Sequence, residues 1–366
     1  MEQNRRERPP LTVSRRLLKT IERQMPCQTT SRRVAFLGRG FTLWGILLAL
    51  VLVAALTLLE QFLVRPCLQR GDGQSKVSVR HGEKLPSMGA EARLPAGLTE
   101  VAPAYLPLLD GMPKDVVEAV QRQLDVSGSE KLPVEVANSI GMHFRLIPHG
   151  DWTIGSPETE NGHSPVEKCH GITLAEPFYM GVCEVTQAQW AAVMGGGENP
   201  SHFRGGERPV EEVSWTQCVA FCRKLEALEH LVKGTYCLPS EAEWEVACRA
   251  GSSAAFCFGD DVARLVEWAD YHENNGRRTS PVGLLRPNAF GLHDMHGNVW
   301  EWCRDLYRNY PGDDTPQSKV HGYRCIRGGN WFVDARECRS ASRSRLPDQS
   351  VGNMLGFRIM RVIRER

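Results

Sequence analysis

The side chains of this 366-residue sequence with the widest chemical range are its cysteine thiols. A thiol can bind a metal, act as a nucleophile or pair in a disulfide. Ten of the 12 cysteines fall between residues 138 and 363: Cys169, Cys183, Cys218, Cys222, Cys237, Cys248, Cys257, Cys303, Cys325 and Cys338. Outside the cytoplasm this number favours disulfides, although the sequence does not determine their connectivity.

The spacing of cysteine and histidine argues against a zinc site. Cys218 and Cys222 lie on an expected helix, but no second Cys or His pair follows at the spacing of a zinc motif. The histidines are scattered, and we interpret the following as surface or loop residues: His163, His170, His272, His293 and His296.

The elements that position these residues begin with three helix starts. Thr186–Gln189, Ser214–Gln217 and Ser240–Glu243 each fit the capping box, in which a hydroxyl and a Glu or Gln side chain satisfy free backbone N–H groups. They predict short helices at 187–194, 215–230 and 241–249. Ala250-Gly251 is a plausible stop for the third helix.

Regular structure elsewhere is predicted to be sparse. Short strand-like runs occur at 143–148, 177–182 and 355–363. No βα alternation or fixed repeat is present, which argues against a doubly wound sheet or a solenoid. Residues 251–350 are rich in Gly, Asn, Asp, Arg and Trp, so we expect loops held by buried tryptophan rings.

The N-terminal part predicts a single membrane anchor. Residues 40–59 carry no charge, and about 20 apolar residues span a bilayer as a helix. Residues 1–39 have a net charge of +7, which places the N-terminus in the cytoplasm and the C-terminal part outside it. The alternative is a cleaved signal peptide, which the long basic region and the lack of a cleavage site disfavour. We therefore assign 1–39 as cytoplasmic and 40–63 as a signal anchor in the membrane.

The rest of the chain divides into a stalk and a domain. Residues 64–137 are assigned as a linker with one short helix at 113–124, and 138–363 as the domain. Beyond residue 39 the net charge is −6, and no basic cluster suggests a nucleic-acid surface.

A series of phrases in the domain resembles the formylglycine-generating (sulfatase-modifying) enzyme family. They run in order as NSIGMHFRLIP (138–148), GSP (155–157), PFYMGVCEVT (177–186), PVEEVSW (209–215), LPSEAEWE (238–245), GLHDMHGNVWEW (291–302), RGGNW (327–331) and GFR (356–358). The resemblance implies a mixed α/β fold with little regular structure, related to the C-type lectin fold.

The resemblance also implies a chemistry. Active members of the family use O2 to convert a sulfatase cysteine to formylglycine, with two thiolates holding a copper(I) ion, a metal that soft ligands suit. Here Val333 stands at the first thiolate position. Counted from Gly328-Gly329, Cys338 occupies the second position and is the catalytic candidate. Counted back from Arg343 it does not, and it is then a buried thiol or half of a disulfide.

Two calcium sites are further implied by the resemblance. At the first, the ligands would be the side chains of Asp294 and Glu301 and the carbonyls of Gly297 and Val299. Calcium prefers several hard oxygens, which a tight glycine-containing loop can supply. The alternative is that the two carboxylates only cap a turn. At the second site the ligands would include Asp270 and the Tyr271 carbonyl, but the later acidic ligand is missing.

Matched positions also bear on disulfides. Cys222 and Cys248 correspond to bridged cysteines of the family, but their partners would fall near Ile359 and Ser340, which cannot form a disulfide. Any bridges must therefore differ from those of the family.

Three functions remain open. In the first, the chain is an oxidoreductase with a groove for an extended cysteine-containing peptide of a sulfatase and a reactive thiol at 330–343. Alternatively, it is a catalytically inactive binding module for a peptide, glycan or protein, or an accessory domain of a membrane complex. The fold alone does not decide between them.

Overall fold

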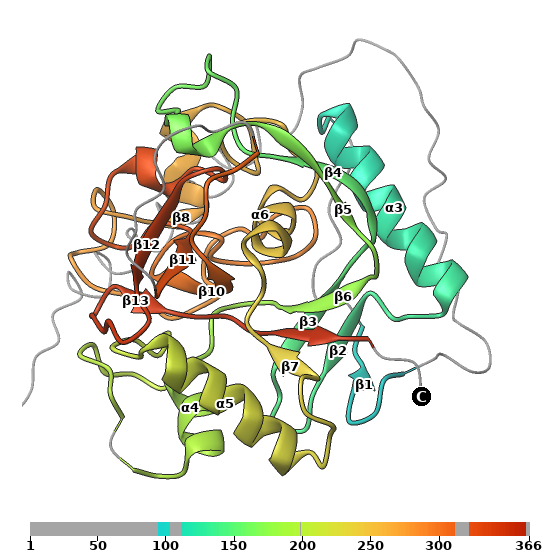
Figure 1. The fold of residues 1–366 in the computed structure, drawn as a ribbon, viewed down its shortest axis with the longest axis vertical. Helices are drawn as coiled ribbons and strands as arrows, with labels where there is room; N and C mark the ends of the chain where they lie inside the picture. Colours follow the sequence, from blue (N-terminus) through green and yellow to red (C-terminus); the bar gives the residue numbers. More distant parts are fainter. Residues whose placement is uncertain (1–93, 103–110, 198, 312–321, 364–366) are drawn as a thin grey trace, which may run out of the picture. The chain divides into compact units, whose positions relative to one another are not determined.

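The computed structural model describes residues 94–102, 111–197, 199–311 and 322–363 (Figure 1). The expected cytoplasmic segment and membrane anchor lie outside these residues. Among the helices that are described, none has the length and apolar character needed to cross a membrane.

The three predicted capping boxes are confirmed. Helices α4 (Gln187–Met194), α5 (Trp215–Leu228) and α6 (Glu241–Arg249) each begin after a capping box in which both reciprocal bonds are formed. Helix α6 ends at Ala250, whose backbone is left-handed with φ of 46°. These boundaries are local, because each box satisfies backbone groups within its own first turn.

The central layer is an antiparallel sheet of six strands. Its order is β1 (Thr99–Glu100), β2 (Glu135–Ala137), β3 (His143–Ile147), β6 (Phe178–Gly181), β14 (Met360–Val362) and β7 (Tyr236–Cys237). Because side chains alternate between the faces of a strand, Tyr179 joins one hydrophobic core and Phe178 and Met180 join the other. The sheet is therefore buried on both faces.

A second sheet carries the WEW phrase of the sequence and leads into the RGG phrase at Arg327. Its order is β12 (Arg343–Pro347), β11 (Tyr323–Arg327), β10 (Trp300–Leu306) and β13 (Leu355–Gly356), with β10 and β13 parallel. Two smaller pairs complete the strands: the hairpin β4 (Gly150–Ile154) with β5 (His170–Leu174), and β8 (Ala269–Asp270) with β9 (His296–Gly297). Three short 3-10 helices also lie within the described residues: η2 (Pro165–Glu167), η3 (Val262–Glu267) and η4 (Ala335–Cys338).

Tryptophan rings fix the irregular segments, as the composition predicted. Trp302 is fully buried and donates its indole N–H to the Val213 carbonyl at 3.0 Å. Trp331 donates to the Asn353 carbonyl at 2.9 Å. These bonds join segments far apart in sequence, so the prediction of a mixed α/β fold with short strands and anchored loops is confirmed.

The main difference from expectation lies before residue 138. Helix α3 (Lys114–Glu130) runs six residues beyond the predicted 113–124, and β1 and β2 pair with the central sheet. Figure 1 shows α3 alongside the β4–β5 hairpin. Val126 is buried, and the Ser127 hydroxyl donates to the Leu132 carbonyl at 2.6 Å. Tertiary packing extends this helix where the local sequence, with Gly128 and two serines, does not.

Helix α3 is therefore expected to contribute to the stability of the domain. Val120 is 3% exposed in a core that it shares with α6. Val120→Ala should cost about 1–3 kcal/mol of unfolding free energy, measured by denaturant titration. Lys114→Ala on the same helix, where the side chain is 89% exposed, should change it by less than about 0.5 kcal/mol. Equal effects would show that α3 does not pack on the core.

Candidate functional site

The segment after β11 crosses over η4 through two glycines. Gly328 and Gly329 have φ of 99° and 78°, and a Cβ on Gly329 would lie 2.7 Å from the Cys338 Sγ. Only glycine fits such a backbone and such a close approach. The RGG phrase thus places Val333 and Cys338 on a tightly folded loop.

Cys338 is fully buried in this loop. It packs in a small core that includes Phe256 and Tyr271, with Val333 packed against the same core. Burial raises the pKa of the Cys338 thiol, and the charges of Asp334 and Glu337 raise it further. A thiol in this setting stays protonated, whereas nucleophilic and copper chemistry need the thiolate.

The expected disulfides are absent from the part of the chain that is described. All ten of its cysteines are free thiols: Cys169 is exposed, Cys183 and Cys237 are half-buried, and the others are buried. The Ser340 side chain lies near the Cys248 thiol. The structure therefore places Ser340 where the resemblance puts the partner of Cys248, and no bridge can form there.

His296 is not the surface residue that we expected. It is 1% exposed in β9, and its Nδ1 donates to the Cys338 carbonyl at 2.7 Å. Its Nε2 then accepts from the Cys257 backbone N–H at 3.2 Å, while the Cys248 Sγ lies 4.0 Å from each ring nitrogen. Because backbone groups engage both nitrogens, the ring holds the backbone segments of Cys257 and Cys338 together and has no nitrogen free for a metal.

An aromatic row borders the loop on its outer side. Phe203, Trp331, Phe332 and His272 follow one another with ring centroids 5.3, 5.4 and 6.2 Å apart. Phe332 is 54% exposed, whereas Trp331 is 7% exposed and fixed by its indole bond. The row thus presents the exposed rings of Phe332 and His272 beside the buried, fixed ring of Trp331.

A cleft of about 640 Å³ opens beside η4. Its walls come from loops 157–162 and 253–262 and from residues 334–339. Arg339 lies in its lining and pairs with Glu160 and Glu167, at N–O distances of 2.5 and 2.9 Å. Its volume falls in the range of ligand clefts.

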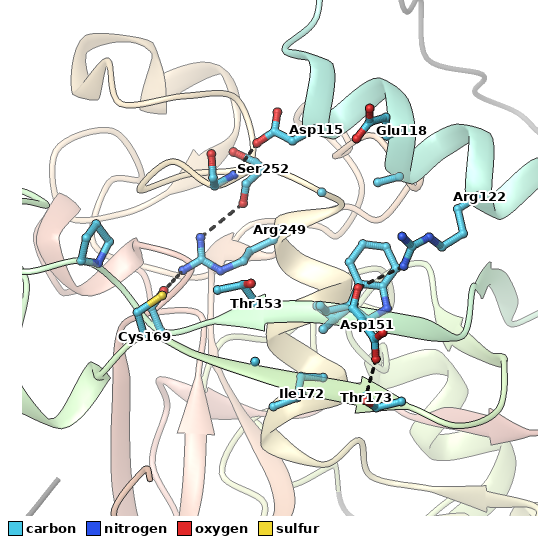
Figure 2. A pocket seen from close by; sticks show the side chains of 18 residues that line it. Asp115, Glu118, Arg122, Asp151, Thr153, Cys169, Ile172, Thr173, Arg249 and Ser252 are labelled. Carbon is cyan, nitrogen blue, oxygen red and sulfur yellow. Dashed lines mark hydrogen bonds between the residues drawn. The ribbon is translucent and has the colours of Figure 1, made fainter. Parts of the chain in front are cut away.

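A larger cavity of about 840 Å³ lies between α3, the β4–β5 hairpin and the end of α6 (Figure 2). Its charged groups are engaged within the fold. Arg249 donates to Glu245 and to the carbonyls of Ser252, Ala254 and Gly155, and Asp115 accepts from the Ser253 N–H. The exposed thiol Cys169 lines the cavity. These contacts tie the walls together.

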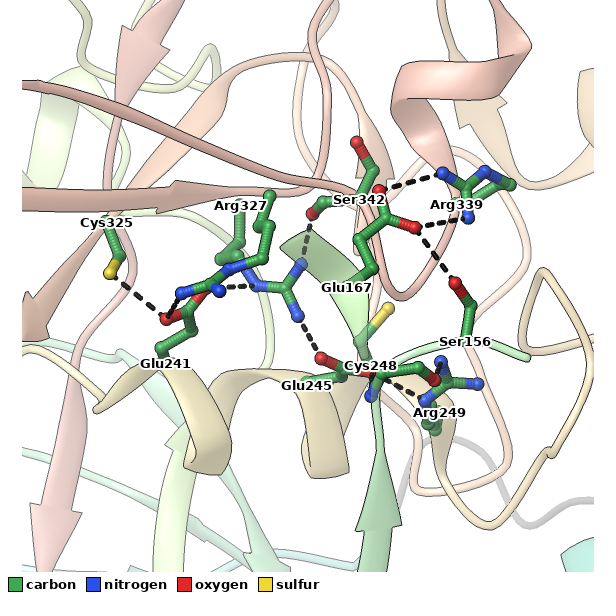
Figure 3. Close-up of polar contacts among 12 residues, drawn as sticks. Ser156, Glu167, Glu241, Glu245, Cys248, Arg249, Cys325, Arg327, Arg339 and Ser342 are labelled. Carbon is green, nitrogen blue, oxygen red and sulfur yellow. Dashed lines mark hydrogen bonds and ion pairs between the residues drawn. The ribbon is translucent and has the colours of Figure 1, made fainter. Parts of the chain in front are cut away.

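A buried charge network connects α6 to the second sheet (Figure 3). Glu241, Glu245 and Arg249 share one helix face because they are four residues apart. Arg343 binds Glu241 through two bonds of 2.8 and 2.6 Å, and Arg327 pairs with Glu245. Burial acts to raise the pKa of Glu245, but the charges of Arg327 and Arg249 outweigh it, and the pKa is lowered.

The first predicted calcium loop is only partly open to a metal. Glu301 is fully buried and binds Arg358 through bonds of 2.6 and 2.7 Å, and its Oε2 also accepts from the Trp244 indole at 2.7 Å. Asp294, with φ of 56°, accepts from the Gly283 N–H at 2.6 Å. Two strong donors thus occupy the Glu301 carboxylate, which leaves Asp294 as the carboxylate that could bind calcium.

The two predicted calcium sites lie next to each other. Gly297 pairs with Asp270 in the parallel β8–β9 ladder, and a Cβ on Gly297 would lie 2.2 Å from the Asp270 carbonyl. Val299 is fully buried two residues further on. The Tyr271 carbonyl accepts from Asn274 at 3.1 Å, and burial raises the pKa of Asp270, which Ser280 contacts. Calcium at these residues stays a prediction.

Glu184, which the sequence reasoning missed, lies beside Asp294. It is 1% exposed, and neither side-chain oxygen has a hydrogen-bond partner among the described residues. Its carboxyl is close enough to that of Asp294 for the two charges to interact. The sequence held one clue, since Glu184 follows the buried run of β6. Across the described ranges, no three His, Cys, Asp or Glu side chains converge as a metal-binding group.

Comparison with known proteins gives matches over most of the described region. The family model of the sulfatase-modifying factor enzyme 1-like domain matches residues 131–363. The chaperone protein LppX of Paenibacillus barcinonensis is 31% identical, over 52% of this chain and 81% of that protein. The formylglycine-generating enzyme of Streptomyces coelicolor is 33% identical, over 41% of this chain and 51% of that protein. The chain thus spans about half of that enzyme.

Two solved structures share the fold. Treponema denticola variable protein 1 aligns with a TM-score of 0.55 and 29% identity, over 63% of this chain and 99% of that protein. PvdO from Pseudomonas aeruginosa aligns with a TM-score of 0.55 and 27% identity, over 62% of this chain and 96% of that protein.

Proposed function

This chain belongs to the sulfatase-modifying factor enzyme 1-like family, and from that starting point we propose that it is a binding module of the fold rather than an oxidase. The observation that carries the proposal is the state of the two thiolate positions. Val333 has no thiol, and Cys338 is fully buried. The family scaffold is kept while the groups that would perform its oxidation are not in place.

The donor set does not fit a copper(I) ion. Copper(I) favours soft sulfur ligands, and the family resemblance implies two thiolates that hold it. The core around Cys338 contains no second cysteine within the described residues, and burial keeps the Cys338 pKa high. We therefore derive no oxidation step for this chain.

The aromatic row is the proposed binding surface, and its ligand is an extended polypeptide. Phe332 offers an exposed ring, and Trp331 and Phe203 hold the support rigid, so little conformational entropy is lost on binding. Aromatic anchors of this kind dominate the binding energy of protein interfaces. The name of one relative, a chaperone protein, also favours the binding of polypeptides.

The location of the ligand follows from the predicted anchor. If residues 40–63 span the membrane with the basic segment 1–39 in the cytoplasm, the domain faces the extracytoplasmic side. Its partner is then an exported polypeptide, of which a sulfatase is one candidate. Addition of a protease to intact cells tests the orientation: cleavage of the domain supports it, and protection contradicts it.

A pair of peptides tests the binding module against the enzyme. Full-length protein in detergent is incubated with copper(I), O2 and a peptide carrying the sulfatase motif, with either Cys or Ser at the modified position. We expect both peptides to bind with similar affinity and neither to change mass. Phe332→Ala should weaken binding about ten-fold or more, as loss of an aromatic anchor does.

The control and the contrary outcomes are equally defined. Val232 is 65% exposed on the loop after α5, outside the aromatic row, and Val232→Ala should leave the affinity unchanged. A loss of mass at the peptide cysteine would make the protein an oxidase. Absence of binding by both peptides would exclude a peptide ligand of this class.

A further inference from the structure

Two buried cysteines face the same core from neighbouring strands. Cys303 on β10 and Cys325 on β11 are both fully buried. They lie next to Trp302 and Ile326, a matched pair of the two strands whose side chains join one hydrophobic core. Cys303 and Cys325 join the other core, as the alternation of side chains along a strand requires. Both thiols therefore point to the same side of the sheet.

The register of β10 and β11 brings the two cysteines opposite each other. Trp302 pairs with Ile326 in this antiparallel ladder, and the register shifts only between Trp302 and Leu306. The next step after the pair places Cys303 opposite Cys325. Residues opposite each other in such a ladder have Cα atoms about 4.5–5.5 Å apart, and a disulfide needs about 4.4–6.8 Å. Burial, followed by the charge of Cys325, raises the pKa of the Cys303 thiol, in agreement with this proximity.

The present contacts of the two thiols do not oppose a bond between them. Cys325 Sγ donates to Glu241 Oε2 at 3.1 Å, but Arg343 already binds both oxygens of that carboxylate. Cys303 Sγ donates to the Glu301 carbonyl at the long distance of 4.0 Å. Because a thiol is a weak donor, loss of the two S–H groups costs little.

We propose that Cys303 and Cys325 form a disulfide between β10 and β11 when the chain folds in an oxidising compartment. The structure shows both as thiols, which is the state before this step. The oxidant is the disulfide of a thiol–disulfide oxidoreductase or of a small molecule such as glutathione disulfide. One thiolate attacks it to give a mixed disulfide, and the second displaces the remaining half. The new S–S bond forms, and the oxidant leaves as two thiols that carry the two protons.

The exchange takes place before the core closes. It needs a thiolate, and in the folded protein burial raises the pKa of both thiols. For the same reason a finished bridge is sealed from reductants, which makes it a permanent link rather than a switch. The link would fix the register of the strands that carry Glu301 and Arg327, which pair across the ladder and belong to the buried ion pairs with Arg358 and Glu245.

Peptide mapping tests the bridge directly. Full-length protein is purified in detergent from cells treated with N-ethylmaleimide, and a second sample is refolded from urea with reduced and oxidised glutathione. Trypsin cuts after Arg304, Arg324 and Arg327. Cys303 and Cys325 then each lie in a peptide with no other cysteine. We expect mass spectrometry to find these two peptides joined, and to find them separate after reduction.

Thermal unfolding provides a second readout. The bridge closes a loop of 23 residues, 303–325, in the unfolded chain. Protein refolded with glutathione disulfide should therefore melt about 5–10 °C higher than protein refolded with reductant alone. Cys303→Ala and Cys325→Ala should each remove this difference. Cys218→Ala should keep it, and it is the matched control because Cys218 is equally buried but lies on α5 in the other core.

The contrary outcomes are defined by the same samples. The proposal is overturned if all 12 cysteines are alkylated in urea without prior reduction in both wild-type samples. It is also overturned if Cys303 or Cys325 is found joined to a different cysteine. The bridge involves no residue of the aromatic row, so it can fail while peptide binding is found, and the reverse.

Discussion

Glu245→Ala is expected to lower the free energy of unfolding by about 3–5 kcal/mol, because it leaves two buried arginines without their common carboxylate. Glu245 is fully buried and accepts from Arg249 and from the Gly155 N–H at 2.8 and 2.7 Å, besides its pair with Arg327. Urea denaturation followed by circular dichroism measures the loss.

The control for this variant is an exposed ion pair. Glu118, 64% exposed, pairs with Lys114 on α3, and Glu118→Ala should cost less than about 0.5 kcal/mol. A cost below about 1 kcal/mol for Glu245→Ala would show that the ion pairs of Glu245 do not stabilise the fold.

The lowered pKa of Glu245 also fixes the sign of a pH effect. Its pKa is lower in the folded than in the unfolded protein, so its stabilisation is present above the ordinary glutamate pKa of 4.5 and is lost as pH falls through the folded pKa. Wild-type protein should therefore lose stability in acid more steeply than Glu245→Gln. Parallel curves would contradict the assignment.

Arg358→Met is expected to cost about 3–5 kcal/mol, because Glu301 would then be a buried charge without a partner. The same change removes the donor from three backbone carbonyls. Thermal and urea denaturation measure the loss, and Arg286→Met provides the control, since that arginine is 63% exposed in its pair with Glu267.

A second substitution separates the ion pair from simple packing. If charge is the cause, Arg358→Met combined with Glu301→Gln should be more stable than Arg358→Met alone, since the buried carboxylate is gone. Strict additivity of the two costs would show that the guanidinium matters only for its shape and its carbonyl bonds.

The sequence predicted those parts of the fold that depend on neighbouring residues. The boxes at Thr186, Ser214 and Ser240 gave the starts of α4, α5 and α6 because a capping box is closed within four residues. It did not give the length of α3, which depends on burial of Val126 against distant segments. Residues 94–130 also lie before the family match, although α3 packs in the core and β1 pairs with β2.

The site was less predictable for the same reason. Glu301 is paired with Arg358, and Glu184 lies near Asp294, in each case with a residue far away in the sequence. Matching to the positions of the family identified Asp294 and Gly297. It could not show that Arg358 donates to both oxygens of the Glu301 carboxylate. The change at Val333 was visible from the sequence, whereas the burial of Cys338 and His296 required the packed structure.

The unequal exposure of the thiols gives the folded domain a built-in reporter. Of its ten described cysteines, Cys169 alone is exposed. A bulky maleimide should therefore attach mainly there while the domain is folded, and at many more positions once it opens. Counting attached groups by mass would then distinguish native, partly opened and unfolded chains without an added tag.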